Sequence, residues 1–131
     1  MTEHPNATLV RRGYEAFNTG DIAAFAELLA DDVVQHQPGD NPLAGDYEGR
    51  DAVLGFYGRL AEETAGTFRA ELEQVLVNGS RVVTVHHSTA TRKGRALDCR
   101  TSLLFEIRDG QAIDIDTLDE DPDAWDRFFC R

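Results

Sequence analysis

The chain has 131 residues, a length that predicts a single domain over residues 1–131. It carries 24 acidic and 13 basic side chains, a net charge of −11, and no compact basic cluster opposes that negative field. Because such a field repels phosphate backbones, the composition argues against a nucleic-acid partner.

The first elements expected along the chain are two helices. Val10, Tyr14 and Phe17 are spaced as one apolar helix face, and the helix ends at residues 18–20, Asn-Thr-Gly. Asp21 can cap the second helix. The expected buried face of that second helix consists of Ile22, Phe25, Leu28 and Leu29.

A short strand is expected next, over residues 33–37, Val-Val-Gln-His-Gln. Pro38 ends this strand because proline has no N–H to donate to a sheet. Residues 38–49 are predicted to be a loop. A third helix follows, with Val53, Phe56, Tyr57 and Leu60 on one side.

After Gly66 the apolar period changes from helical to alternating. Asn78-Gly79, Gly94 and Asp109-Gly110 separate four strand-like runs, and Asn-Gly between apolar runs is a strong hairpin signal. We therefore expect a four-stranded antiparallel meander over residues 68–118.

A closing helix is expected from Asp121 and Pro122, with Trp125, Phe128 and Phe129 on one face. Helices, then a curled antiparallel sheet, then a short helix predict an α+β fold in which one layer packs on the other.

Three stretches carry a family resemblance: YEAFNTGDIAAFAELLADDVV (14–34), PGDNPLAGDYEGRDAVLGFYGRL (38–60) and DAWDRFF (123–129). They resemble the SnoaL-like branch of the nuclear-transport-factor-2-like superfamily, to which ketosteroid isomerase also belongs. The resemblance implies a cystatin-like α+β roll: a cone-shaped antiparallel sheet curled around three N-terminal helices, with an apolar pocket between them. It also implies a homodimer. It does not choose a function, because this fold hosts isomerases, cyclases, hydrolases, dehydratases and non-catalytic binders.

The groups that ketosteroid isomerase uses are absent at the matching positions. The base position is Gln37, and an amide cannot abstract a proton. The oxyanion aspartate position is Leu103, and the tyrosine position is Gly13, one residue before Tyr14. Steroid isomerisation by that mechanism is therefore rejected.

Hydrolase chemistry of the limonene-epoxide-hydrolase type needs two aspartates and an arginine around one water. Asp98 and Arg100 share a strand face, but the alternating apolar residues put the opposite face inward. We expect Asp98 and Arg100 to be a charge pair on the surface or at a dimer interface.

Two residues are the catalytic candidates. In SnoaL-type cyclases an aspartate acts as acid and base, and Asp119 is the candidate by parity, in register with inward Ile115 and Thr117. The alternative for Asp119 is a structural role at the start of the closing helix. His86 should point inward and His87 outward, so His86 is a candidate general base, or else a hydrogen-bonded core histidine.

The polar trio Gln35-His36-Gln37 is expected to line or flank the mouth of the cone. Gln37 can orient a carbonyl or hydroxyl group, and His36 should point to the other face unless a bulge intervenes. The expected ligand pocket comprises Tyr14, Phe17, Phe25, Gln35, His36, Gln37, Tyr57, Ser88, Cys99, Thr101, Leu103, Phe105 and Trp125.

Neither a metal nor a cofactor is expected, since no second ligand lies at metal-binding spacing from His36 or His86. Residues 1–8 lack the pattern of a secretory signal, and no apolar run approaches the ~20 residues of a membrane span. Cys99 and Cys130 are interpreted as free thiols, with one disulfide as the alternative. We expect a cytoplasmic protein without a membrane partner.

Three functions remain open. The first is an isomerase or cyclase acting on a small, mostly apolar, oxygenated ring compound; the second is a non-catalytic protein that binds or carries such a compound. The third is an interaction module whose cone is only a core. Polar groups in an apolar interior favour a real pocket. A homodimer is expected to use outward residues of the last strands, among them Asp98, Arg100, Ser102, Leu104 and Leu118.

Overall fold

The N-terminal part of the computed structural model, which describes residues 3–130, consists of two helices joined by a tight turn. The first, α1 (Pro5–Thr19), ends at Gly20, whose φ of 75° is a left-handed conformation that glycine adopts at low cost. The second, α2 (Ile22–Glu27), begins at Asp21, whose carboxylate accepts a 3.1 Å hydrogen bond from a backbone N–H of the first turn. The end of α1 and the cap of α2 agree with the sequence pattern.

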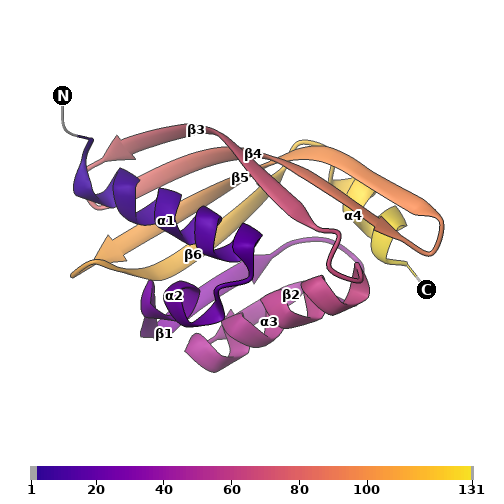
Figure 1. Cartoon of the computed structure of the whole chain (residues 1–131), viewed down its shortest axis with the longest axis horizontal. Coiled ribbons are helices and arrows are strands. Elements are labelled where there is room, and N and C mark those ends of the chain that lie inside the picture. The colour runs from indigo at the N-terminus through magenta and orange to yellow at the C-terminus, as the bar shows by residue number, and fades with distance from the viewer. Residues whose placement is uncertain (1–2, 131) are drawn as a thin grey trace.

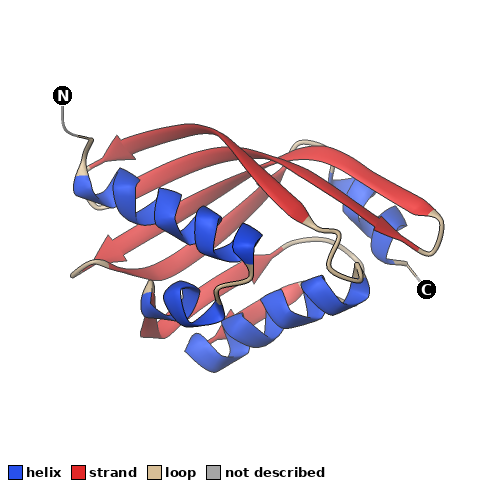
Figure 2. Ribbon diagram, in the orientation of Figure 1, coloured by secondary structure: helices blue, strands red, loops and turns tan. Residues whose placement is uncertain are grey.

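The centre of the fold is one curled sheet of six strands in the order β2-β1-β6-β5-β4-β3 (Figure 1, Figure 2). The expected antiparallel meander is confirmed as β3 to β6. Two of its turns, Lys93-Gly94 and Asp109-Gly110, have positive φ at both positions, the geometry typical of two-residue hairpins. The strands are β1 (Leu29–Gln37), β2 (Gly45–Glu48), β3 (Arg69–Asn78), β4 (Arg81–Arg92), β5 (Arg95–Arg108) and β6 (Gln111–Asp119).

Two features of the sheet differ from the expectation. The sheet is mixed rather than wholly antiparallel, because β1 runs parallel to β6 and pairs Gln35 with Ile115. Residues 38–49 are not a plain loop, since they contain β2, which pairs with β1. β2 is short and mostly exposed, so it has no alternating apolar face to reveal it. The alternation within β1 says which face is buried, but not the direction of its partner.

The second helix is shorter than its apolar spacing predicts. It ends at Glu27, and Leu29 is instead buried in β1. Ile22 is 62% exposed, so the expected buried face shrinks to Phe25 and Leu28, which are partly buried. Leu29 pairs with Ala112 of β6, and the Ala112 N–H donates to the Leu28 carbonyl at 2.8 Å.

The helices cover one face of the curled sheet, which confirms the predicted α+β architecture (Figure 1). α1 packs against β3, and α3 (Arg50–Glu63) packs against β1. The closing helix α4 (Pro122–Phe129) packs against β5 and buries its three aromatic side chains, as its spacing predicts. No helix among residues 3–130 is long and apolar enough to cross a membrane.

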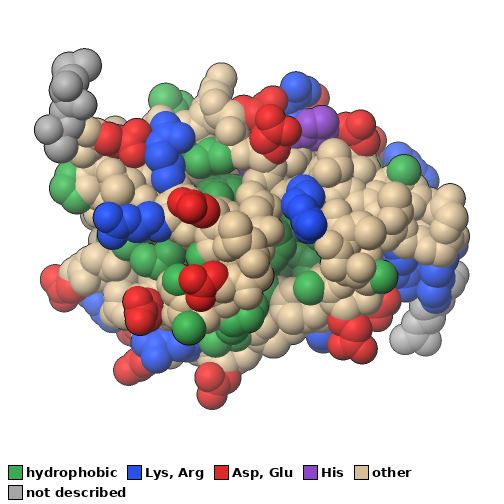
Figure 3. Space-filling view, viewed as in Figure 1, with side chains coloured by type: hydrophobic (Ala, Val, Ile, Leu, Met, Phe, Trp, Pro, Cys, Tyr) green, Lys and Arg blue, Asp and Glu red, His purple; other side chains and the backbone are tan. Residues whose placement is uncertain are grey.

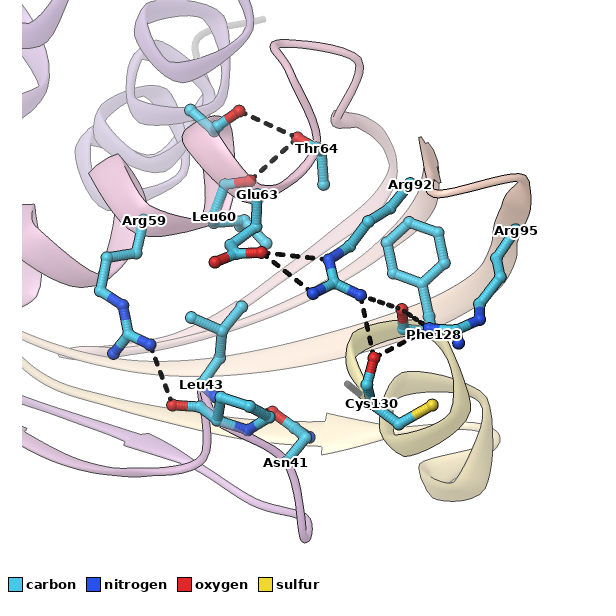
Figure 4. A network of polar contacts seen from close by, with 12 residues as sticks. Asn41, Leu43, Arg59, Leu60, Glu63, Thr64, Arg92, Arg95, Phe128 and Cys130 are labelled. Carbon is cyan, nitrogen blue, oxygen red and sulfur yellow. Dashed lines mark hydrogen bonds and ion pairs between the residues drawn. The ribbon is translucent and has the colours of Figure 1, made fainter.

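A buried arginine, Arg92, joins α3 to α4 at the tip of the β4–β5 hairpin (Figure 4). Its side chain is only 7% exposed, and its Nε and Nη2 atoms both lie 3.1 Å from Glu63 Oε2. Nη1 donates to the carbonyls of Phe128 and Cys130 at 3.2 and 3.0 Å, and Arg95 donates to the Cys130 carbonyl at 2.8 Å. Within this hairpin turn, Arg92 thus pairs carbonyls that a helix end leaves unsatisfied. We call this set of contacts the Arg92 clasp.

Candidate functional site

A cavity lies between the concave face of the sheet and the four helices. Its volume is about 90 Å³. Seen from the helix side, Figure 3 shows hydrophobic side chains in the recesses between the helices. Much of the cavity wall is aromatic and is made by Phe17, Phe25, Phe56, Tyr57, Phe68 and Trp125.

Four buried polar atoms in this apolar wall have no hydrogen-bond partner among residues 3–130. They are Gln35 Oε1 and Gln37 Nε2 on β1, Thr117 Oγ1 on β6 and Trp125 Nε1 on α4. An unpaired buried polar group costs free energy of folding, and native proteins leave few of them. Four such atoms around one cavity indicate that a ligand or ordered water supplies their partners.

One carboxylate lies at the edge of the cavity. The Oδ1 atom of Asp119, at the end of β6, accepts a 3.1 Å hydrogen bond from the hydroxyl of Thr101, a residue of the cavity wall. Burial raises the pKa of Asp119 to about 6, although the Thr101 hydrogen bond lowers it in part. The carboxyl group can therefore both accept and release a proton near neutral pH, as a general acid and base must.

A hydrogen-bonded group of three polar side chains crosses from α1 to β4. The Tyr14 hydroxyl lies 2.8 Å from Thr84 Oγ1 and 2.5 Å from His86 Nδ1, and all three residues are buried. Burial raises the pKa of Tyr14 and lowers that of His86 to about 4, which the charge of Glu73 offsets only in part. Tyr14 and His86 are therefore uncharged at neutral pH.

These pKa values distinguish the two catalytic candidates, His86 and Asp119. Desolvation lowers the pKa of His86 to about 4, which does not suit a general base near neutral pH. The end of β6 also provides the burial that Asp119 needs for a raised pKa. Of the two, Asp119 is the group whose pKa suits proton transfer near neutral pH.

Most of the side chains proposed for the pocket line the cavity. The positions on the strands follow the alternation of the sequence, and the others lie on α1 to α4. Those in the wall are Tyr14, Phe17, Phe25, Gln35, Gln37, Tyr57, His86, Thr101, Leu103, Phe105 and Trp125.

Four proposed site residues lie outside the cavity wall. His36 is on the opposite face of β1, between Asp46 and Asp114 at 2.9 and 3.1 Å, because β1 has no bulge that would turn its side chain inward at this position. Hydrogen bonds that the His36 ring donates to these carboxylates, above all to Asp46, raise the pKa of His36. Ser88 is buried behind the wall, 3.4 Å from the Thr101 hydroxyl, and the half-buried Cys99 and Asp119 lie beside the wall rather than in it.

Some wall residues were absent from the sequence-based list. Thr117 is the most informative, since its hydroxyl is one of the unpaired atoms and the alternation of β6 already placed it inward. The others are Gly13 and a set of apolar residues, several of which, such as Val10 and Phe56, already lay on apolar helix faces in the sequence. They are Leu9, Val10, Leu28, Leu29, Phe56, Leu60, Phe68, Ala70, Ile107, Ala112 and Ile115.

The charged residues considered for hydrolase chemistry face away from the cavity. Asp98 pairs with His87, and Arg100 donates to Glu73 at 2.7 Å, on the outer face of the sheet. Residues 3–130 also contain no group of three His, Cys, Asp or Glu side chains arranged to hold a metal ion.

The helices, the curled sheet and the apolar cavity between them define a nuclear-transport-factor-2-like protein. Within that class the chain belongs to the SnoaL-like domain family, whose sequence model matches residues 10–115. It is 35% identical over 131 residues to the uncharacterized protein Rv0034 of Mycobacterium tuberculosis, covering 99% of this chain and 100% of that protein.

Two solved structures illustrate the family likeness. Bal32a, from a soil-derived mobile gene cassette, is 42% identical with a TM-score of 0.93, over 95% of this chain and 96% of that one. Wild-type IdmH of Streptomyces antibioticus, described as a candidate polyketide cyclase, is 22% identical with a TM-score of 0.75, over 90% and 93% of the two chains. The likeness to IdmH shows the fold alone.

Proposed function

We propose that the protein binds a small, mostly apolar, oxygenated ring compound in the cavity. The observation that carries this proposal is the group of four unpaired polar atoms in an apolar wall, on Gln35, Gln37, Thr117 and Trp125. An apolar ring would fill the aromatic part of the cavity, and its oxygens would pair these atoms. A core without a ligand would gain nothing from leaving them unpaired.

As an enzyme, the protein would act as an isomerase or cyclase without a cofactor, with Asp119 as acid and base. The carboxylate would take a proton from a carbon next to a ligand carbonyl, and the electron pair of that C–H bond would move onto the carbonyl oxygen. N–H donors of Gln37 and Trp125 are free to stabilise that oxygen. The raised pKa of Asp119 and its contact with Thr101 of the cavity wall support this version.

The second version is a non-catalytic binding or carrier protein that uses the same cavity. Epoxide-hydrolase-type chemistry is the weakest alternative, because Asp98 and Arg100 lie on the outer face. A cytoplasmic location is part of the proposal, and the free thiols of Cys99 and Cys130 support it.

The binding proposal predicts opposite effects of one substitution on stability and on affinity. Gln37→Met removes an unpaired buried amide at similar volume, so it should raise the free energy of unfolding by about 1 kcal/mol. The same change should weaken binding of the test ketone α-tetralone, for which we expect a Kd of about 0.1–1 mM. Urea unfolding and the fluorescence of Trp125, the single tryptophan, measure the two effects.

Glu15→Gln, an exposed change on the outer side of α1, is the matched control and should alter neither quantity. The binding proposal fails if α-tetralone changes neither the fluorescence nor the heat of titration up to its solubility limit.

We also propose a homodimer formed through the outer face of the sheet. The strand register places Leu76, Val83 and Leu104 in one row across three strands, with Leu118 nearby on β6. Leu76 and Leu118 are 62% and 58% exposed, which leaves an apolar patch for a second copy to cover.

Light scattering should therefore give about twice the chain mass of 14.5 kDa at micromolar concentration. The double variant Leu104→Lys/Leu118→Lys should give the single-chain mass, because lysines would meet across the two-fold axis. A wild-type mass of one chain contradicts the dimer.

A further inference from the structure

The group formed by Thr84, Tyr14 and His86 has two possible arrangements of its hydrogens. In the first, the Thr84 hydroxyl donates to the Tyr14 oxygen, and the Tyr14 hydroxyl donates to His86 Nδ1. In the second, every bond is reversed: His86 Nδ1–H donates to Tyr14, and Tyr14 donates to Thr84. The two distances, 2.8 and 2.5 Å, are both those of hydrogen bonds.

The two arrangements differ in whether the hydrogen of the Thr84 hydroxyl has an acceptor. Thr84 has an exposed fraction of 0%, and among residues 3–130 its hydroxyl has no hydrogen-bond partner other than Tyr14. In the second arrangement that hydrogen is buried without an acceptor, which is unfavourable. In the first arrangement every polar hydrogen of Thr84 and Tyr14 is used, and the Nδ1 lone pair of His86 is used as well.

The length of the Tyr14–His86 bond supports the first arrangement. Hydroxyl donors make shorter hydrogen bonds than ring N–H donors do, and the distance from the Tyr14 oxygen to His86 Nδ1 is 2.5 Å. Since Nδ1 is then an acceptor, the single ring hydrogen of the neutral imidazole must be on Nε2.

The Nε2 atom of His86 is available to a ligand. The ring lies in the cavity wall, and no atom of residues 3–130 forms a hydrogen bond with Nε2. The low pKa of His86 keeps the ring neutral at physiological pH, so the ring carries a single N–H donor and no charge.

We propose that His86 uses Nε2–H to donate a hydrogen bond to an acceptor oxygen of the ligand, and that Tyr14 and Thr84 are positioning residues that hold this tautomer. The inference rests on the proposed function in so far as a ligand enters the cavity. It assigns His86 the role of a donor to a carbonyl, ether or enolate oxygen, in place of the general base that the sequence suggested.

The tautomer can be measured without any ligand, by the ¹⁵N shifts of the histidine ring nitrogens in labelled protein. The His86 signals are identified by their loss in His86→Gln. We expect a protonated Nε2 and an unprotonated Nδ1 in the wild type, and a mixture of tautomers in Tyr14→Phe. A wild-type ring protonated at Nδ1 overturns the proposal.

The donor role is tested with two matched probes, α-tetralone and its analogue in which a methylidene group replaces the carbonyl oxygen. Calorimetric titration of the wild type should show about tenfold tighter binding of the ketone, the effect of one hydrogen bond. His86→Leu should abolish this preference. His86→Gln, which keeps an N–H donor at a similar place, should retain most of it.

The ratio of the two affinities separates the donor role from a structural one, since a distorted cavity weakens both probes together. Equal binding of the two probes by the wild type overturns the donor role and leaves the proposed function standing, and so does a preference that survives in His86→Leu. Binding of neither probe overturns the proposed function and with it the ligand contact of His86; the ring-nitrogen shifts then decide the tautomer alone.

Discussion

Asp119→Asn is expected to lower the rate of proton transfer in the cavity by about 10²–10⁴-fold, the usual contribution of a positioned acid or base. Asparagine keeps the size of the side chain and a hydrogen-bond acceptor for Thr101, which lies 3.1 Å from Asp119 Oδ1, but it cannot take a proton. The measurement is deuterium uptake at the carbon next to the carbonyl of α-tetralone in D2O, followed by NMR. Binding of the ketone should change little in the variant.

The pH dependence of exchange gives a second readout of the same residue. Because burial raises the pKa of Asp119 to about 6, the basic carboxylate form is the minority below pH 6. Exchange by the wild type should therefore rise through pH 6 and level off above it. Asp119→Asn should lose this rise.

Stability should follow pH in the opposite direction. A folded-state pKa above the usual 3.8 means that folding favours the protonated form of Asp119. This stabilising contribution is complete below about pH 3.8 and is lost as pH rises through about 6. At pH 7 the Asp119→Asn variant should thus be at least as stable as the wild type.

Two results would count against this role. Exchange by Asp119→Asn at the wild-type rate would show that another group is the base. Exchange by the wild type no faster than by buffer, despite binding of the ketone, would favour the non-catalytic binding protein over the enzyme.

The site residues that could be predicted are those whose orientation follows from the alternation of side chains within a single strand. Alternation along β5 places Thr101, Leu103 and Phe105 on the inner face, and the same rule places Asp119 in register with Thr117. The rule also put His36 on the opposite face from Gln35, where the structure has it; a bulge would have been needed to bring it into the pocket.

What could not be predicted depends on contacts between distant segments. Tyr14 and His86 are 72 residues apart. Nothing in the sequence around either residue predicts that the two are buried together and form a hydrogen bond. The low pKa of His86 and the raised pKa of Asp119 follow from burial that only the packed helices create. The parallel pairing of β1 with β6 is of the same kind, because it joins segments on either side of the meander.

The Arg92 clasp could not be predicted either, because a basic run at a hairpin tip is usually exposed to solvent. Its effect on stability should nevertheless be large. Arg92→Met is expected to lower the free energy of unfolding by about 2–4 kcal/mol, since it leaves the carbonyls of Phe128 and Cys130 without their buried donor. Urea unfolding followed by circular dichroism measures the loss.

The same substitution should loosen α4 before the rest of the chain unfolds. Trp125 is 4% exposed and is carried into the cavity wall by α4, so its fluorescence should shift to the red at lower urea than the circular dichroism signal changes. In the wild type the two transitions should coincide.

Glu63→Gln separates the ion pair of the clasp from its carbonyl contacts. The Glu63 side chain is 41% exposed, so water can replace its contact with Arg92, and the loss should stay below about 1 kcal/mol. If Arg92→Met costs no more than Glu63→Gln, the carbonyl contacts contribute little, and α4 is held by the apolar packing of Trp125, Phe128 and Phe129 alone. A cost several times larger shows that the buried guanidinium fixes the helix that closes the cavity.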